Sequence, residues 1–306
     1  MAQTALILGA SGRFGRHAAE AFEKAGWTVR RFRRGGDLTR AAMGCDVIVN
    51  AWNPPYPDWF REVPAYTPKV IEAARASGAT VIVPGNVYVF GEGSPECLGP
   101  ETPHAAQNPL GRVRVEMEAA YRRSGVQTII LRGGDFLDTN ASGNWLDQMV
   151  KKIDTGVLIY PGDTGASHAW AFLPDMARAA VALAEIRHQL EVFEDIPFPG
   201  YTLTATELVA AIGDVLDRPV RIRRFPWLLL RLIRPFWRMA TGLLEMSYLW
   251  RMPHRLDGTR MAELLPDFRP APLGEAIFET LKPHVDPNKT VPRSEAHSGG
   301  KVRGIA

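Results

Sequence analysis

Short apolar runs alternate along this chain with longer segments in which apolar residues recur at helical spacing. The strand-like runs lie at 4–8, 26–32, 46–50, 80–83 and 127–132, and the helix-like segments lie at 17–24, 64–77 and 112–124. A repeated order of strand and helix is typical of a parallel sheet with helices on both faces. We therefore predict an α/β fold with a Rossmann-type, doubly wound parallel sheet.

The second half of the chain predicts a smaller C-terminal α/β substrate domain. Its pattern gives a helix over 176–187, a segment at 202–207 that fits an N-cap followed by a helix to Leu216, and a short strand at 219–223. Asp175 is expected to cap the helix that starts at Met176. The predicted division is a Rossmann domain over 1–188 with a substrate-loop excursion at about 136–166, a small substrate or lid domain over 189–283, and a disordered tail over 284–306.

The first apolar run leads directly into a glycine-rich turn and then into a helix. Gly9 permits a tight turn, Gly12 lets backbone N–H groups approach a pyrophosphate, and Gly15 lets helix and strand pack closely. The spacing is G-x-x-G-x-x-G rather than the common G-x-G-x-x-G. We predict a dinucleotide site here, lined also by the loop residues Ser11, Arg13 and Phe14 and, at the end of the third strand, by Asn50 and Ala51.

The end of the second strand predicts which nucleotide is bound. An NAD site would place a carboxylate here for the ribose 2′-hydroxyl, whereas this chain has Arg33 and Arg34 and no carboxylate before Asp37. A guanidinium suits a 2′-phosphate because it makes bidentate, charge-assisted hydrogen bonds. Arg13 could reach the same phosphate, and Asp37 and Leu38 would lie near the adenine. We predict NADP in preference to NAD, with a solvated basic strand end as the alternative.

Composition excludes several classes of function. The chain has 306 residues, of which 46% are hydrophobic and 23% charged, and its net charge of +3 is too small for a nucleic-acid-binding surface. Its two cysteines, Cys45 and Cys97, form no ligand cluster, which indicates a reducing compartment and no metal. The first residues enter a strand without a basic and apolar leader, so we expect a cytoplasmic protein.

The segment 226–250 has the least usual composition in the chain. It interleaves Leu, Trp, Phe and Met with Arg231, Arg234 and Arg238, and it contains Pro235, which should kink a helix. Charges this frequent argue against a membrane span. We expect a lid or a homodimer surface, and an interfacial helix remains the alternative.

Over roughly residues 3–282, seven segments resemble, in their order and spacing, those of the short-chain dehydrogenase/reductases. The resemblance is to the extended or atypical members of that family, the epimerase/dehydratase type. The segments are the glycine motif, 50–51, 87–91, 101–103, 108–112, 130–136 and 172–178. The resemblance implies an NAD(P)-dependent enzyme in which a Tyr exchanges a proton, a Lys four residues later lowers its pKa, and a Ser or Thr orients the substrate oxygen.

This chain departs from that pattern at all three catalytic positions. Matching Asn108-Pro109-Leu110-Gly111 to the family's Asn-Pro-Tyr-Gly places Leu110 at the tyrosine position. Arg114 then stands at the lysine position and Asn86 at the serine position. Leu110 cannot transfer a proton, and Arg114 is a permanent cation of different reach.

Three interpretations follow from these substitutions. Tyr88 is the nearest phenol and could act as a displaced acid, with Arg114 stabilising its phenolate and Asn86 holding a carbonyl oxygen, although it could equally be a packed aromatic. Water or the substrate could instead supply the proton, or the protein could be a non-catalytic NADP-binding regulatory or sensor protein. His168 fits a structural or substrate-orienting role. We expect an NADP-dependent oxidoreductase or epimerase/dehydratase-like enzyme acting on a small carbonyl compound or nucleotide-linked sugar.

Overall fold

The computed structural model describes residues 2–285. Of the tail predicted to be disordered from residue 284, the positions 286–306 lie outside the described residues. His284 itself ends a short 3₁₀ turn, Lys282–His284, and its Nε2 lies 2.9 Å from Oδ1 of Asp147. The prediction of disorder is wrong for His284, because a buried carboxylate anchors the turn.

Six parallel strands form the central sheet, and the sequence predicts five of them. Their order is β10 (Phe193–Pro197), β6 (Thr128–Arg132), β4 (Thr80–Gly85), β3 (Val47–Asn50), β1 (Thr4–Leu8) and β2 (Thr28–Arg31). Every residue of β1, β3 and β6 is buried. Strands covered on both faces need apolar residues at successive positions, which explains the continuous runs in the sequence.

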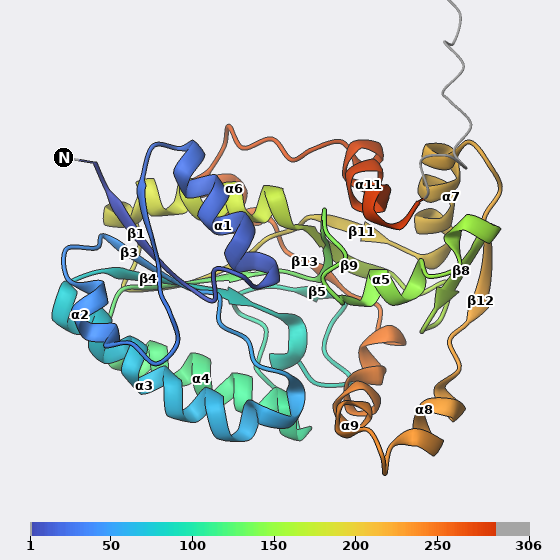
Figure 1. The fold of residues 1–306 in the computed structure, drawn as a ribbon, viewed down its shortest axis with the longest axis horizontal. Coiled ribbons are helices and arrows are strands. Elements are labelled where there is room, and N and C mark those ends of the chain that lie inside the picture. The colour runs from blue at the N-terminus through green and yellow to red at the C-terminus, as the bar shows by residue number, and fades with distance from the viewer. Residues whose placement is uncertain (1, 286–306) are drawn as a thin grey trace, which may run out of the picture.

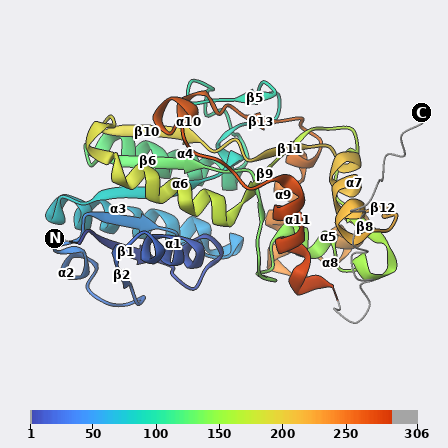
Figure 2. The ribbon, with the colours of Figure 1, turned by 90° about the horizontal axis from the view of Figure 1, so that it is seen from above.

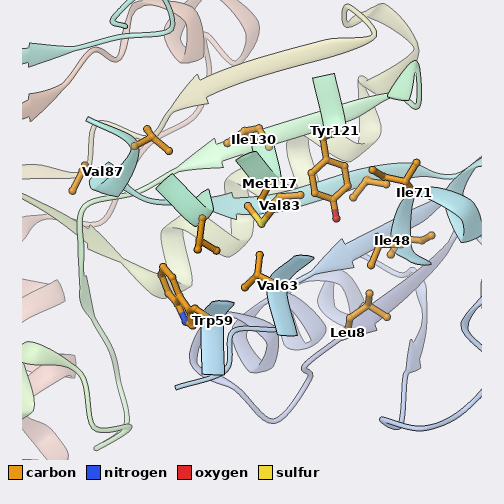
Figure 3. Packing of buried hydrophobic residues seen from close by; sticks show 14 of the residues in the cluster. Leu8, Ile48, Trp59, Val63, Ile71, Val83, Val87, Met117, Tyr121 and Ile130 are labelled. Atoms are coloured by element: carbon orange, nitrogen blue, oxygen red, sulfur yellow. The ribbon is translucent and has the colours of Figure 1, made fainter. Parts of the chain in front are cut away.

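Helices cover both faces of this sheet (Figure 1). On one face, α1 (Arg13–Lys24) and α6 (Leu173–Glu185) pack against alternate strand residues such as Ala5 and Ile7. On the other face, α2 (Leu38–Ala42), α3 (Trp59–Ser77) and α4 (Pro109–Ser124) pack against Leu6 and Leu8. Figure 3 shows this second cluster. The doubly wound Rossmann-type fold is therefore confirmed.

Two helices begin earlier than the sequence predicts. α3 starts at Trp59 instead of Pro64, and both Pro64 and Pro68 lie inside it. α4 starts at Pro109 instead of Arg112. A proline at the first helical position loses no hydrogen bond, because the N–H groups of the first turn have no partner within the helix.

A second unit lies beside the sheet (Figure 2). It contains a three-stranded sheet, a two-stranded sheet and three helices around its own apolar cluster. Its elements are β7 (Asp135–Leu137), β9 (His168–Phe172), β11 (Tyr201–Leu203), β8 (Val157–Tyr160), β12 (Arg221–Arg224), α5 (Trp145–Met149), α7 (Ala205–Leu216) and α11 (Leu273–Leu281). The predicted excursion over 136–166 thus supplies part of this unit.

The elements do not follow the predicted division at residue 188. β10 comes after that boundary but forms an edge of the main sheet. The later segments also return to the Rossmann core, since α10 (Thr259–Leu264) buries Met261 against it and β13 (Arg255–Leu256) pairs with β5 (Cys97–Leu98).

The two predicted helix caps have different outcomes. The N-cap predicted within 202–207 is confirmed, since Thr204 caps α7 and forms a reciprocal capping box with Glu207. Asp175 is not a cap: α6 begins at Leu173, so Asp175 lies in its first turn. The Asp175 carboxylate accepts hydrogen bonds from Nη2 of Arg178 and from the backbone N–H of Ala271.

The unusual segment 226–250 forms two short helices instead of one kinked helix. α8 (Trp227–Ile233) ends just before Pro235, and α9 (Arg238–Glu245) begins after it. A 3₁₀ turn, Met246–Trp250, follows. Among residues 2–285, the structure contains no helix with the length and apolar character needed to cross a bilayer.

Candidate active site

The crevice of this fold lies where the strand order reverses. β1 and β3 are neighbours, yet the chain continues from β1 to β2 on one side and from β3 to β4 on the other. Ligands of open α/β sheets bind outside the carboxyl ends of the strands at such a point. Gly9 follows the last residue of β1, and Ala51 follows the last residue of β3.

The three glycines of the loop have the geometry that their spacing predicts. Gly9 has a φ of +72°, and its carbonyl accepts a hydrogen bond from the N–H of Gly12 at 2.8 Å. A Cβ on Gly15 would collide with that same carbonyl, so only glycine allows α1 to lie this close. Gly12 stands at the N-cap of α1, which has no side-chain cap and no acidic residue in its first turn. This helix end fits a pyrophosphate.

Two other residues of the loop are engaged by the protein itself. The Phe14 side chain is buried in the layer between α1 and α6, so a contact with the cofactor stays a prediction that would involve its backbone N–H at the helix end. The Arg13 guanidinium donates to the carbonyls of Ser142 and Gly143, at 3.2 and 2.7 Å. Arg13 therefore ties the glycine loop to the segment between β7 and α5. Ser11 is exposed in the turn.

Asn50, at the end of β3, supports the sheet from within. Its Nδ2 donates to the hydroxyl of Tyr121 on α4 at 2.9 Å (Figure 3 shows Tyr121). The Asn50 side chain therefore belongs to the layer of α3 and α4. The carbonyl of Ala51 faces the Gly9 turn, since a Cβ on Gly9 would lie 3.0 Å from it. Contact between Asn50 and a cofactor stays a prediction, and it would involve the backbone.

The basic end of β2 lies open to solvent. Arg33 and Arg34 are both exposed, and the Arg34 guanidinium lies 5.0 Å from the ring centre of Trp52, just after β3. Asp37 caps α2 by accepting a hydrogen bond from the N–H of Arg40. Leu38 is buried in the core, and its position near the adenine stays a prediction.

The positions of the missing catalytic residues lie together near the carboxyl end of β4. Leu110 is buried and its N–H donates to Oε1 of Glu245. Arg114 is buried, donates to Oδ1 of Asn53 at 2.6 Å and stacks 4.1 Å from the ring centre of Trp59. Asn86 caps the 3₁₀ turn Val87–Val89 through its Oδ1, which leaves the Nδ2 to donate elsewhere.

Tyr88 is paired with a second tyrosine that the sequence analysis did not identify. The hydroxyls of Tyr88 and Tyr56 are 2.5 Å apart, and the Trp59 ring lies against both phenol rings. Tyr56 lies in a 3₁₀ turn, Tyr56–Asp58, that follows β3. No local pattern links residues 32 positions apart, so only the path of the chain after β3 brings the pair together.

Burial controls the protonation of this tyrosine pair. It raises the pKa of Tyr88 well above its usual value, and Tyr56 and Asp135 add to the effect while Arg114 opposes it. Burial likewise raises the pKa of Tyr56 to about 12, although its hydrogen bond to Tyr88 opposes the rise. Both phenols are therefore neutral at physiological pH, and they can donate protons but cannot act as phenolate bases.

The helix α9, in the C-terminal half of the segment 226–250, forms a wall of this site. A Cβ on Gly242 of α9 would lie 2.6 Å from Cδ2 of Tyr56, so the helix backbone packs directly on that ring. Glu245, at the end of α9, accepts hydrogen bonds from Nδ2 of Asn108 and from the N–H of Leu110, at 2.9 and 2.6 Å. Glu245 thus binds the N-terminus of α4, which carries Leu110 and Arg114, to the covering helix.

His168 is held in a buried aromatic group. Its Nε2 lies 2.7 Å from Oδ2 of Asp135, and its ring stacks on Trp250 with 4.2 Å between ring centres. His254 lies edge-on to it, at 4.5 Å between ring centres. This packing favours the structural or orienting role over a catalytic one.

Two buried acidic groups share one arginine as their partner. Glu118 and Asp195 could be metal ligands together with His104. Arg132 donates to both carboxylates, at 2.7 and 2.6 Å, and all three charged groups are buried. This arrangement fits an internal ion-pair network.

Comparisons with known proteins agree on the fold. The model of the NAD dependent epimerase/dehydratase family matches residues 5–195. A search of curated proteins finds no match. Among solved structures, the chain is similar to human epimerase family protein SDR39U1 with NADPH (17% identity, 91% of this chain and 99% of that one, TM-score 0.71). It is also similar to MoeE5 in complex with UDP-glucose and NAD (13%, 92% and 97%, 0.70) and to a nucleoside-diphosphate-sugar epimerase from Staphylococcus aureus (16%, 90% and 99%, 0.66).

The family match covers the glycine loop, the tyrosine pair and all six strands of the sheet except the first residue of β1 and the last two residues of β10. These are the parts that form the crevice and the substituted catalytic positions. Together with the parallel sheet and the helix end suited to a pyrophosphate, the match identifies an NAD(P)-dependent enzyme. The chain belongs to the NAD dependent epimerase/dehydratase family.

Proposed function

We propose that this protein is an NADP-dependent oxidoreductase that reduces a small carbonyl compound or a nucleotide-linked sugar. The observation that carries the proposal is the half-buried, neutral Tyr56–Tyr88 pair beside Arg114, at the end of the sheet where the family's Tyr and Lys are replaced. A neutral phenol suits reduction, which requires a proton donor, better than oxidation, which requires a base.

The preference for NADP rests on the exposed guanidinium groups of Arg33 and Arg34. Asp37, the first carboxylate after β2, is engaged as the cap of α2. A 2′-phosphate would therefore meet two cations that have no strong competing partner, since the closest contact of Arg34 with a carboxylate is 3.7 Å, to Glu62. The human SDR39U1 structure contains NADPH, whereas MoeE5 contains NAD.

In the proposed reaction, NADPH held along the glycine loop would supply a hydride to the carbonyl carbon. As the C=O electron pair moves to oxygen, Tyr88 gives its hydroxyl proton to that oxygen. The Tyr56 hydroxyl, 2.5 Å away, and the cationic Arg114 then stabilise the Tyr88 phenolate until it regains a proton from solvent. Asn86 presents its Nδ2 to the carbonyl oxygen.

The test is a substrate panel. Purified protein is incubated with NADPH or NADH and with aldehydes, ketones or UDP-linked sugars, and cofactor oxidation is followed by absorbance. We expect turnover of at least one carbonyl class, with NADPH preferred. Nucleotide binding without turnover of any substrate in either direction would contradict the proposal and favour a non-catalytic NADP-binding regulatory protein.

A further inference from the structure

The outer side of α8 and the turn after it expose an unusual group of large apolar side chains. Leu228, Leu232 and Phe236 are 70%, 66% and 91% exposed, and Leu229 and Trp237 are exposed beside them. We call these five residues the α8 surface. They account for five of the nine exposed large hydrophobic residues in the described chain, and they fall within ten positions of the sequence.

Packing on the inner side of α8 fixes which side faces outward. The Trp227 indole N–H donates to the carbonyl of Pro161 at 2.7 Å, and its ring contacts Trp145 and Phe225. Leu230 is buried on the same side. The helix is therefore anchored by its own apolar residues, and the α8 surface is a second apolar face that this chain leaves uncovered.

Arginines flank and interrupt the α8 surface along the sequence, with no acidic residue among them. Six of them are exposed, namely Arg221, Arg223, Arg224, Arg231, Arg234 and Arg238. No Asp or Glu occurs from Arg218 to Leu244. Within residues 2–285, the structure pairs none of the six with a carboxylate. The positive charge of these six arginines is therefore available to bind an anionic partner.

We propose that the α8 surface binds peripherally to an anionic lipid bilayer. Leu, Phe and Trp side chains enter the boundary between headgroups and acyl chains, while the arginines contact lipid phosphates. A helix with an anchored inner side and an apolar outer side flanked along the sequence by cations fits a planar anionic surface.

The positive charge of the arginines argues against two other partners for the α8 surface, namely a second copy of this protein and the segment 286–306. A second copy docked face to face would bring the same arginines together, which like-charge repulsion disfavours. The segment 286–306 carries Lys289, Arg293, Lys301 and Arg303 against Asp286 and Glu295, so its net charge of four minus two, or +2, does not complement the face.

The surface is also adjacent to the candidate active site. α9 follows directly after Trp237, and its Gly242 packs on Tyr56. Figure 1 shows α8 at the outer edge of the molecule, with α9 between it and the helices below the sheet. A bilayer contacted by α8 would therefore lie beside one wall of the site.

The experiment is co-sedimentation of the full-length protein with vesicles of phosphatidylcholine alone or mixed with phosphatidylglycerol. We expect binding to the mixed vesicles that weakens as salt is raised, and little binding to phosphatidylcholine. Leu232→Ser combined with Phe236→Ser should weaken binding at least tenfold. Arg231→Gln combined with Arg234→Gln should weaken it by about fivefold for each arginine.

Matched controls remove similar groups elsewhere. Phe60→Ser deletes an exposed aromatic ring from α3, and Arg112→Gln with Arg123→Gln deletes two exposed charges from α4. All variants should keep the wild-type melting temperature and nucleotide affinity. The proposal is overturned if the wild-type protein does not bind the mixed vesicles, or if controls and α8 variants lose binding equally. It is also overturned if Leu232→Ser with Phe236→Ser abolishes a dimer instead of vesicle binding.

Discussion

At the residue scale, Arg33 and Arg34 are expected to select the cofactor. Replacing both by Ser should weaken NADP binding at least tenfold and NAD binding much less, because each charge-assisted bond to a 2′-phosphate contributes about 1.5–3 kcal/mol. Calorimetric titration with both nucleotides measures the ratio. Lys24→Ser, at the far end of α1, is the control. If the arginine variant binds both nucleotides equally weakly, the pair is only general surface charge.

The sequence could predict the roles of residues that depend on local backbone geometry. It could not predict roles that depend on packing against segments far away in the sequence. The glycine loop needs a positive φ at Gly9 and no side chain at Gly15, so sequence spacing reveals both. Phe14 lies in the same loop, but the packing of α6 on α1 turns its ring into the core. The pairing of Tyr88 with Tyr56 depends on the chain path after β3, which no local pattern contains.

At the scale of elements, α9 is expected to hold Tyr56 in place. Gly242→Ala puts a methyl group within 2.6 Å of the Tyr56 ring, so the ring or the helix must move. Turnover should fall about tenfold or more with nucleotide affinity kept, because small displacements of catalytic groups are costly. Gly274→Ala on α11, where a Cβ meets nothing within 4 Å, should leave turnover unchanged. Equal activity of the two variants would show that α9 does not position the site.

The sequence predicted which strands and helices form better than it predicted the residues at which they begin and end. Buried parallel strands need unbroken apolar runs, and those predicted for β1, β3, β4 and β6 are present, whereas the edge strand β2 is mostly exposed. Helix starts were misplaced at Pro64 and Arg112, because α3 begins five residues before Pro64 and continues through it, and α4 begins at Pro109. β10 was missed, since Glu194 and Asp195 interrupt its apolar pattern to meet Arg260 and Arg132.

At the scale of the whole molecule, a buried histidine links stability to pH. Burial, with a contribution from the neighbouring His168, lowers the pKa of His254 from 6.5 to about 4. The unfolded chain therefore binds a proton at a pH where the native state does not, so stability present above about pH 6.5 is lost as the pH falls toward 4.

A substitution isolates this dependence. In His254→Asn, the asparagine amide can replace the Nδ1 contact with the carbonyl of Met252. The unfolding free energy that this variant loses between pH 7 and 4.5 should be smaller than the wild-type loss by about 2 kcal/mol. Denaturant titrations at the two pH values measure it. The exposed His188→Asn serves as the control, and an unchanged loss in His254→Asn would contradict the assignment.

The central claim is that a displaced tyrosine supplies the proton, and Tyr88→Phe tests it most directly. Turnover and nucleotide affinity are measured on the same preparations of wild-type protein, Tyr88→Phe and Tyr201→Phe, the last of which loses a hydroxyl bonded to the carbonyl of Ala271 in the second unit. The account predicts that Tyr88→Phe loses about a hundredfold or more in turnover at nearly unchanged affinity, while Tyr201→Phe stays active. A Tyr88→Phe enzyme as active as the wild type would contradict it.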